Sequence, residues 1–305
     1  MTAVLLPQNL SELWQMVSVF PDATVYAGGT DLLVKLKIGQ LSPQALICLE
    51  RIPELKGVVD GGDHVTIHAA TPFSQLLTDS LLIREFPALC QAMTTLGSPL
   101  IRNMGTIGGN ICTASPAGDT IPPLTVLNAE LELVSANGIR HLPINRFITG
   151  PGQIGLYPGE ILSAIHVPKP KPGSIQFFEK VGQRNALTCS IVSMAAIVWL
   201  SDTNRVDAVS LAWGSVGPTI MTCPGVENML TGHRLTSDIL KKAGNMVIRT
   251  VLPITDIRAS ADYRRKVAGN LMLRLCDRYS FPDKDFRGWP REGLSPPCCL
   301  PKIII

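Results

Sequence analysis

Residues 97–119 have the sequence GSPLIRNMGTIGGNICTASPAGD, which is rich in glycine and small residues and almost uncharged. Between Arg102 and Asp119 the only ionisable side chain is the thiol of Cys112. The stretch offers backbone N–H groups and neutral polar side chains, among them Thr106, Asn110, Thr113 and Ser115. Such donors suit a diphosphate that is held by amides and hydroxyls rather than by lysines. The alternative is a buried loop whose polar groups satisfy one another.

A second glycine turn lies nearer the N-terminus, where AGGTD spans residues 27–31. The short β-branched and aromatic segment 23–27 predicts a strand, and the leucines that follow predict a helix beginning at Leu32. A turn between strand and helix can hold phosphate, because the first N–H groups of a helix lack intrahelical acceptors. The alternative is a plain tight turn in which Thr30 or Asp31 caps the helix. With phosphate bound, the Asp31 carboxylate would have to point away.

Several other sites are disfavoured by the motifs that the chain lacks. Neither glycine turn has the G-x-G-x-x-G spacing of a Rossmann site, and no G-K dipeptide supports a Walker A loop. H-E-x-x-H and G-x-S-x-G are also absent. The five histidines are His64, His68, His141, His166 and His233. Their wide separation in the sequence disfavours a metal site. The residues alone therefore indicate a two-loop binder of a large phosphorylated cofactor, with no acid–base dyad of its own.

Composition limits the class of protein further. The length of 305 residues suffices for about two domains. With 46% apolar and 17% charged residues, the chain is neither intrinsically disordered nor a coiled coil, and a net charge of +3 is too small to indicate nucleic-acid binding. The longest apolar run, 191–200, is too short to span a bilayer, and a secretory signal is not expected. Eight cysteines without C-x-x-C spacing indicate buried thiols in a reducing cytoplasm, and any iron–sulfur cluster belongs to another chain.

Hydrophobic periodicity predicts an α+β chain with a boundary in its middle. Predicted helices are 10–17, 32–36, 74–82, 87–96, 237–247 and 261–278, and predicted strands are 23–27, 45–49, 57–59, 64–69, 130–135, 140–144, 175–181, 189–200 and 206–213. Hairpins are expected at Asn137-Gly138 and at 201–204. The alternating prolines of 167–173 predict a stiff connector between two domains.

The last predicted helix carries three basic residues away from its apolar stripe, and the prolines after Tyr279 predict an irregular tail. These three, out of five basic residues between 261 and 278, are Arg264, Lys266 and Arg274. Because they lie off the stripe, they are expected to form a solvated face rather than a nucleic-acid patch.

Three segments carry a resemblance to a known family. They are AGGTDLL at 27–33, GSPLIRNMGTIGGNICTASPAGD at 97–119 and PINRFITGPGQIGLYPGEIL at 143–162. They resemble the FAD-binding subunits of molybdenum hydroxylases, and most of all the separate flavin subunit of bacterial xanthine dehydrogenases. The resemblance covers residues 3–280 and includes no cysteine-rich insertion of the kind that holds an extra [4Fe–4S] cluster in some relatives.

The resemblance implies a fold and a cofactor site. The fold is α+β, with a two-subdomain FAD-binding domain of the vanillyl-alcohol-oxidase (PCMH) type at 1–172, a smaller α+β domain at 174–280 and a tail at 281–305. The implied cofactor contacts are Tyr26, Ala27, Gly28, Gly29, Thr30, Asp31, Leu32, Leu33, Leu96, Thr106, Gly109, Asn110, Ile111, Cys112, Thr113, Ala114, Asp119, Leu162 and Lys180.

Some of these residues carry finer expectations. Asp119 is expected to accept a hydrogen bond from a ribityl, ribose or adenine group, and its replacement by alanine to weaken FAD retention while sparing the fold. A valine at Gly108 is expected to intrude on the diphosphate. Without the family, Leu162 would be taken as strand core and Lys180 as an exposed strand charge.

The resemblance also implies a function. Electrons taken from a substrate at a molybdenum cofactor would pass through two [2Fe–2S] clusters on a partner to the FAD of this chain, and then to NAD+. The partners would be an iron–sulfur subunit and a molybdenum-binding subunit. One alternative is a self-sufficient FAD-dependent oxidase of the same fold. Others are the FAD subunit of a nicotinate, aldehyde, aromatic acyl-CoA or carbon monoxide dehydrogenase, and an interaction protein that has lost FAD.

Overall fold

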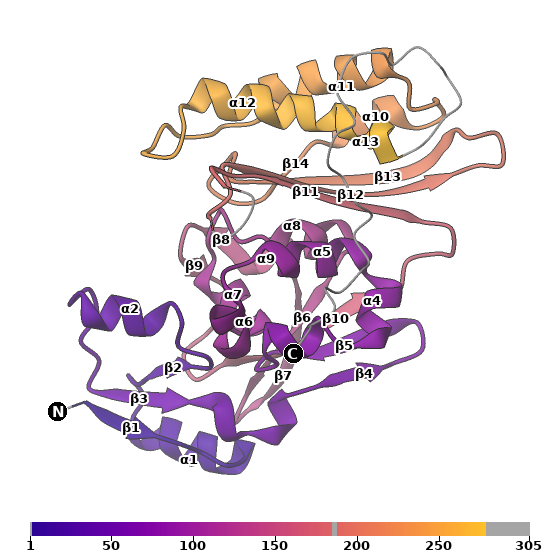
Figure 1. The fold of residues 1–305 in the computed structure, drawn as a ribbon. Helices are drawn as coiled ribbons and strands as arrows, with labels where there is room; N and C mark the ends of the chain where they lie inside the picture. The colour runs from indigo at the N-terminus through magenta and orange to yellow at the C-terminus, as the bar shows by residue number, and fades with distance from the viewer. Residues whose placement is uncertain (1, 185–187, 279–305) are drawn as a thin grey trace, which may run out of the picture.

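A computed structural model describes residues 2–184 and 188–278. The chain forms two small subdomains followed by a C-terminal domain, which lies at the top of Figure 1. The α+β class and the two-part first domain expected from the sequence are confirmed. None of the helices in the described part of the chain has the length and apolar character needed to cross a bilayer. The predicted tail lies outside the described residues.

The N-terminal subdomain is a three-stranded parallel sheet in the order β1-β3-β2. Its elements are β1 (Ala3–Leu5), α1 (Leu10–Val19), β2 (Thr24–Tyr26), α2 (Leu32–Lys37), β3 (Ala45–Cys48) and the 3-10 turns η1 (Leu49–Arg51) and η2 (Pro53–Leu55). Helix α1 begins where predicted, because the side chain of Asn9 accepts from the N–H of Glu12. Leu13 of α1 and Ile47 of β3 share a small core with Ile161 of the next subdomain, which joins the two units.

The second subdomain is a five-stranded antiparallel sheet in the order β4-β5-β10-β6-β7, with helices on one face. The strands are β4 (Val58–Asp60), β5 (His64–His68), β6 (Glu130–Ser135), β7 (Gly138–Pro143) and β10 (Ile161–Pro168). The helices are α3 (Phe73–Leu76), α4 (Ser80–Glu85), α5 (Pro87–Thr95), α6 (Pro99–Met104), α7 (Ile107–Thr113), α8 (Ile121–Val126) and α9 (Ile144–Phe147), and β8 (Ile148–Gly150) pairs with β9 (Gln153–Ile154).

Two expectations for this subdomain were wrong in detail. The helix predicted at 74–82 is split into α3 and α4, because the Asp79 carboxylate accepts from the N–H groups of Leu81 and Leu82 and starts a new helix. The glycine-rich stretch 97–119 is not a continuous loop, since it contains α6 and α7. The hairpin predicted at Asn137-Gly138 is confirmed by the pairing of β6 with β7.

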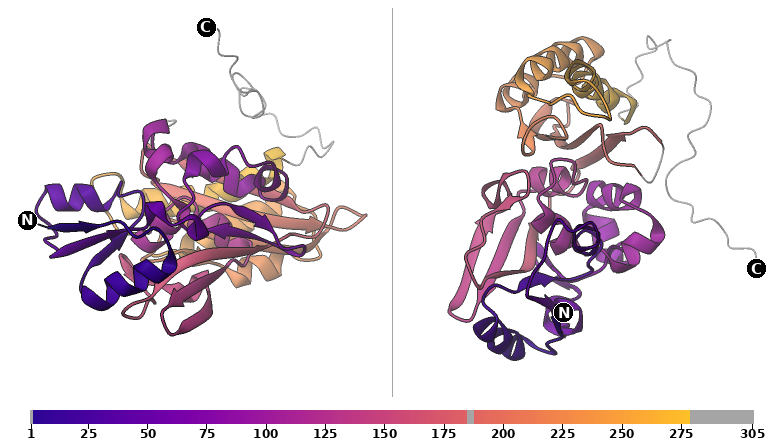
Figure 2. Two further views of the ribbon diagram at one scale, coloured as in Figure 1. Left: turned by 90° about the horizontal axis from the view of Figure 1, so that it is seen from below. Right: turned by 90° about the vertical axis from the view of Figure 1, so that its left-hand side faces the viewer.

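The C-terminal domain is a four-stranded antiparallel sheet, β11-β12-β13-β14, that is covered on both faces (Figures 1 and 2). Its elements are β11 (Ile175–Val181), β12 (Val192–Leu200), β13 (Val206–Gly214), β14 (Met221–Thr222), α10 (Pro224–Leu230), α11 (Ser237–Thr250), α12 (Ala261–Asn270), η3 (Leu271–Leu273) and α13 (Arg274–Arg278). Ala195 and Ile197 of β12 join the core of the second subdomain, whereas Met194 and Ala196 face α10, α11 and α12. The sheet therefore packs against the second subdomain through one of its two faces.

The basic face predicted for the last helix was partly wrong. Arg264 is 3% exposed, and its guanidinium donates to the carbonyls of Ile191 and Ser215 at 2.8 and 3.0 Å and pairs with Asp256 at 2.7 Å. Those carbonyls lie just before β12 and just after β13, so the arginine satisfies strand ends that water does not reach. Lys266 is exposed, as expected. The predicted single helix at 261–278 is interrupted by η3.

Candidate functional site

The two glycine turns meet in space. We name Ala27–Asp31, between β2 and α2, the first glycine loop, and Gly105–Asn110, which opens α7, the second glycine loop. A Cβ atom built on Gly28 would lie 1.7 Å from the carbonyl oxygen of Met104, directly before the second loop. Only glycine allows backbones to approach so closely. The loops therefore form one surface, although about eighty residues separate them in the sequence.

Most N–H groups of the first glycine loop have no acceptor in the described part of the protein. This holds for Gly28, Gly29 and Thr30, none of which belongs to a helix or strand, and for Asp31. Gly29 has a φ of +69°, a conformation that glycine adopts without strain. Because these residues are partly or fully exposed, their amides are available to a ligand.

The N–H groups of the second glycine loop are mostly used inside the protein. Those of Ile107 and Gly108 donate to the carbonyls of Thr71 and Ala69, at 3.3 and 2.9 Å. Gly109 donates to the hydroxyl oxygen of Thr106, the N-cap of α7, at 3.1 Å. The N–H groups of Gly105 and Asn110 donate to carbonyls one helical turn back in the chain. The backbone N–H of Thr106 itself has no acceptor among the described residues.

Gly108 serves packing, which corrects the expectation that its side-chain space belongs to a diphosphate. A Cβ atom there would lie 2.5 Å from the Cβ and 2.7 Å from the carbonyl oxygen of Ala69, at the end of β5. The residue is buried and lets α7 contact the central sheet.

A surface depression lies where the two loops meet. It is lined by Ala27, Gly28, Glu50, Lys56, Ala70, Pro72, Asn103, Met104 and Thr106. Sequence reasoning missed Glu50, Lys56 and Asn103 as site residues. Glu50 and Lys56 follow β3, and the pairing of β3 with β2, in which Cys48 lies opposite Tyr26, brings them near the first loop. Nothing in their local sequence identifies them as site residues. An ammonium group at this place, Lys56, suits an anionic ligand.

Polar side chains after the second loop are partly engaged within the protein. The hydroxyl of Thr113 donates to the carbonyl of Gly109 at 2.9 Å, and the side-chain oxygen of Asn110 accepts from Thr120 at 2.6 Å. The Asn110 amide nitrogen and the Thr106 hydroxyl hydrogen remain as donors, because neither donates to an acceptor in the described structure.

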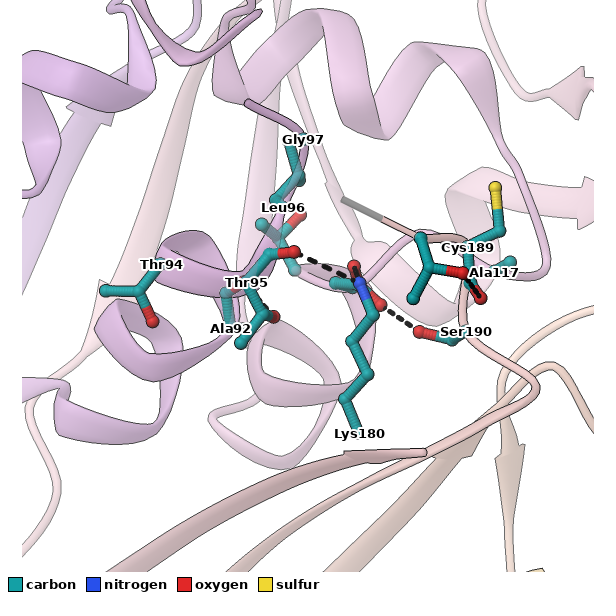
Figure 3. A network of polar contacts seen from close by, with 12 residues as sticks. Ala92, Thr94, Thr95, Leu96, Gly97, Ala117, Lys180, Cys189 and Ser190 are labelled. Atoms are coloured by element: carbon teal, nitrogen blue, oxygen red, sulfur yellow. Dashed lines mark hydrogen bonds and ion pairs between the residues drawn. The ribbon is translucent and has the colours of Figure 1, made fainter. Parts of the chain in front are cut away.

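Asp119 and Lys180, both expected as cofactor contacts, form a buried ion pair with each other. Their side chains are 6% and 7% exposed, and the Lys180 Nζ lies 2.5 Å from one Asp119 oxygen. The hydroxyl of Ser190 donates to the other oxygen, and Lys180 also donates to the carbonyl of Thr95 at 3.2 Å, beside Leu96 (Figure 3). Lys180 is thus neither exposed nor free, and both Asp119 oxygens have protein partners.

This network fastens the C-terminal sheet to the end of the glycine-rich stretch. Lys180 lies on β11, whereas Thr95 ends α5 and Asp119 lies just before α8. Burial raises the pKa of Asp119, and the Lys180 ammonium and the Ser190 hydroxyl offset part of that rise by stabilising the carboxylate. The Asp119–Lys180 ion pair therefore fixes the position of β11 relative to the end of α5 and the start of α8.

Two other ionisable residues from the predicted set are held neutral. Burial raises the pKa of the Cys112 thiol to about 12, and burial together with a hydrogen bond to Cys48 raises the pKa of Tyr26 to about 12. Neither group supplies a charge or a nucleophile at neutral pH. The Asp31 carboxylate makes an ion pair with Lys35 at 2.6 Å and no helix-cap bond, so its charge is offset on α2.

Three predicted contact residues have side chains in the core. Ile111, Ala114 and Leu162 are 0%, 1% and 4% exposed. Ala114 ends α7 in a left-handed conformation with a φ of 47°, and Leu162 packs within the second subdomain. These three side chains lie in the core and support the backbone of the site. Leu32 and Leu96 are partly buried, and Leu33 and Gly109 are exposed.

The residues present fit the diphosphate of a dinucleotide. A row of N–H groups without acceptors, a glycine (Gly28) whose Cβ would fill the junction, and the ammonium of Lys56 beside the carboxylate of Glu50 form a cradle without net charge.

Comparison with known families agrees with this site. Residues 1–170 match the FAD binding domain in molybdopterin dehydrogenase, and residues 177–279 match the CO dehydrogenase flavoprotein C-terminal domain. The chain belongs to this family of FAD-binding proteins, and FAD is the cofactor of its first domain. Relatives of the chain include FAD-binding and medium-chain subunits of molybdenum hydroxylase complexes, which have iron–sulfur and molybdenum-cofactor partners.

Individual relatives include subunits of several enzymes. The chain is 35% identical over 261 residues to a xanthine dehydrogenase FAD-binding subunit of Escherichia coli O157:H7, covering 84% of this chain and 88% of that one. It is 31% identical to the carbon monoxide dehydrogenase medium chain of Hydrogenophaga pseudoflava, covering 83% and 88%. A solved structure of carbon monoxide dehydrogenase from Hydrogenophaga pseudoflava matches with a TM-score of 0.85 at 28% identity, covering 90% and 95%.

Proposed function

We propose that this chain is the FAD-binding subunit of a xanthine dehydrogenase. In this proposal its FAD receives electrons from [2Fe–2S] clusters on an iron–sulfur partner subunit, which is fed by a molybdenum-binding subunit, and passes them to NAD+. The complex works in the cytoplasm. The observation that carries the proposal is the 35% identity to a xanthine dehydrogenase FAD-binding subunit, which extends over both domains.

The first glycine loop would hold the diphosphate of FAD. Its four N–H groups without acceptors begin at Gly28, which lines the depression together with Thr106 and Lys56. Amide donors neutralise a diphosphate without the flexibility of long side chains. The second glycine loop would support the first, because its own amides are bonded and Gly28 rests against Met104.

The remaining residues would position the flavin end. The Asn110 amide and the exposed edge of Gly109 would face the ligand beyond the diphosphate, and Leu96 would provide an apolar contact next to the Asp119–Lys180 pair. When bound, FAD supplies the redox chemistry, and the residues of this chain bind and orient it. We further propose 1–172, 174–280 and 281–305 as the domains and the tail.

The proposal is tested on the purified complex that contains this chain. NADH formation is measured with xanthine, and in parallel with nicotinate, an aldehyde, an aromatic acyl-CoA and carbon monoxide. Xanthine with NAD+ is expected to give the highest kcat/KM. A complex that oxidises another substrate of this panel in preference would overturn the xanthine assignment, and one that needs another acceptor would overturn the NAD+ assignment.

A variant pair separates the role of FAD from the role of the partner subunits. In the complex with Gly28→Ala, xanthine-dependent NADH formation is expected to be lost together with FAD. Gly225→Ala on α10 is the matched control, because its added Cβ would meet only Met246, at 3.5 Å. If isolated, FAD-loaded chain oxidised a substrate without its partners, the protein would instead be a self-sufficient oxidase.

A further inference from the structure

The face of the five-stranded sheet that points away from the helices gathers four of the five histidines of the chain. In the right-hand view of Figure 2, the strands of this sheet line the left side of the molecule, with the helices to their right. His64 and His68 come from β5, His166 from β10 and His141 from β7. These histidines are far apart in the sequence, which disfavoured a metal site, but strand pairing brings them close together in space.

Strand register places a carboxylate between the histidines. Glu132 of β6 lies opposite His141 of β7, and on its other side it is diagonal to His166 of β10. One ligand atom from each of these three residues lies within 4.8 Å of the others. The rings of His141 and His166 have their centroids 5.3 Å apart.

The distances suit a small transition-metal ion. Zinc binds histidine nitrogen and carboxylate oxygen at about 2.0–2.2 Å, which places two ligand atoms of a tetrahedral site roughly 3.3–3.5 Å apart. His166 Nε2 and Glu132 Oε2 are 3.5 Å apart. The His141 side chain is 44% exposed, and its Nδ1 lies 3.6 Å from Glu130 Oε2, a surface contact that metal binding would replace. Two histidines and one carboxylate leave a coordination position for water.

One ring nitrogen of His166 makes no hydrogen bond in the described structure and is available to bind a ligand. Its Nε2 is buried and makes no hydrogen bond among the described residues, although Glu132 Oε2 lies 3.5 Å away. Its Nδ1 is 2.9 Å from the hydroxyl of Thr66, and donation to that oxygen leaves Nε2 with a lone pair, the form that binds metals. The other Glu132 oxygen accepts from Ser163 at 2.6 Å, which orients Oε2. Both ligands thus have the outer hydrogen bonds that metal ligands commonly have.

We propose that Glu132, His141 and His166 bind one divalent transition-metal ion of the Zn²⁺ type, with water completing its coordination. The ion would tie together β10, β6 and β7 on the face opposite the helices. Because these ligands are nitrogen and carboxylate oxygen without thiolate, the site would prefer Zn²⁺, Ni²⁺ or Cu²⁺ over Mg²⁺ or Ca²⁺.

The test is calorimetric titration of the untagged, chelator-treated full chain with ZnCl₂. We expect one saturable site per chain, which His141→Gln and Glu132→Gln each abolish. His141→Gln changes an exposed residue, and Glu132→Gln keeps an acceptor for Ser163, so both variants should fold. Thr66→Val should weaken binding about 10–100-fold through the orientation of His166. His233→Gln, outside this sheet, is the control and should bind like the unaltered chain.

Cobalt gives a second readout that does not depend on affinity alone. Co²⁺ bound by the chain should show the visible absorption of a four-coordinate ion, and His141→Gln should remove it. The proposal would be overturned by the absence of saturable zinc binding, or by zinc binding that the Glu132 and His141 variants leave unchanged. A loss that His233→Gln reproduces would also overturn it, because surface histidines in general would then be responsible.

Discussion

The two glycine loops look alike in sequence but differ in where their amides point. The N–H groups of the first loop have no acceptors in the described structure, whereas those of the second donate mainly to Thr71, Ala69 and the cap of α7. Glycine in the first loop permits contact with a neighbouring backbone and a positive φ, while Gly108 in the second permits helix packing. Loops rich in glycine can thus serve a ligand or the fold, and only their hydrogen bonds distinguish the two.

The largest effect is expected from Gly28→Ala. The added Cβ would lie 1.7 Å from the Met104 carbonyl oxygen, so the first loop must move away from the second. FAD retention should be lost, while the melting temperature of the chain without FAD changes little because the loop lies at the surface. The flavin-to-protein absorbance ratio measures the first effect and calorimetry the second. Full flavin occupancy in this variant would contradict the claim that the first loop binds FAD.

The next effect is expected from Lys180→Met, which leaves the buried Asp119 carboxylate without its cation. Removing one partner of a buried ion pair costs about 3–5 kcal/mol. For the same reason Asp119→Ala should destabilise the chain, contrary to the expectation that it would spare the fold. The double variant Asp119→Leu with Lys180→Met should recover much of the loss in urea unfolding. Equal instability of the single and double variants would contradict the ion-pair account.

Gly108→Ala tests the second glycine loop, which we expect to serve packing rather than FAD binding. Its Cβ would crowd Ala69 at 2.5 Å, and overpacking of this kind costs about 1–3 kcal/mol. Stability should fall, but the folded fraction should still bind FAD, because the packed side of α7 is affected and the first loop is not. The FAD dissociation constant is measured at a temperature where the variant is folded. Complete loss of FAD without loss of stability would reverse the roles given to the two loops.

The smallest effect is expected from Glu160→Gln, away from both loops. Hydrogen bonds from Arg140 at 2.6 and 2.7 Å lower the pKa of Glu160. A lowered pKa adds stability above the ordinary value of 4.5, which is lost as the pH falls through the folded-state pKa. The variant should cost about 1 kcal/mol at pH 7 and nothing in strong acid, with unchanged FAD binding. A cost independent of pH would contradict this.

Local sequence predicts most of the elements and the two loops. Strand β11 and the hairpin of β6 with β7 follow from alternation and turn chemistry, and Asn9 marks the start of α1. The glycine turns and the family motif by themselves indicate the FAD-type domain. These features depend on neighbouring residues, which is why the sequence is sufficient for them.

Features that depend on long-range pairing could not be predicted. Lys180 pairs with Asp119 across 61 positions, and Arg264 reaches Ile191 across 73. Sequence reasoning therefore expects Arg264 on a solvated face, and it expects Lys180 as a cofactor contact from the family resemblance or as an exposed charge without it. The same holds for the histidines, which strand register gathers on one face. In the second loop, glycine content alone does not reveal that the amides are already bonded.

Amide hydrogen exchange of the two loops, with and without FAD, tests the central claim most directly. The account predicts that the N–H groups of Gly28 to Asp31 exchange rapidly without FAD and become protected when it binds, whereas those of Gly108 to Asn110 are protected in both states. Rapid exchange at Gly28 to Asp31 that FAD leaves unchanged, with new protection confined to the second loop, would contradict it.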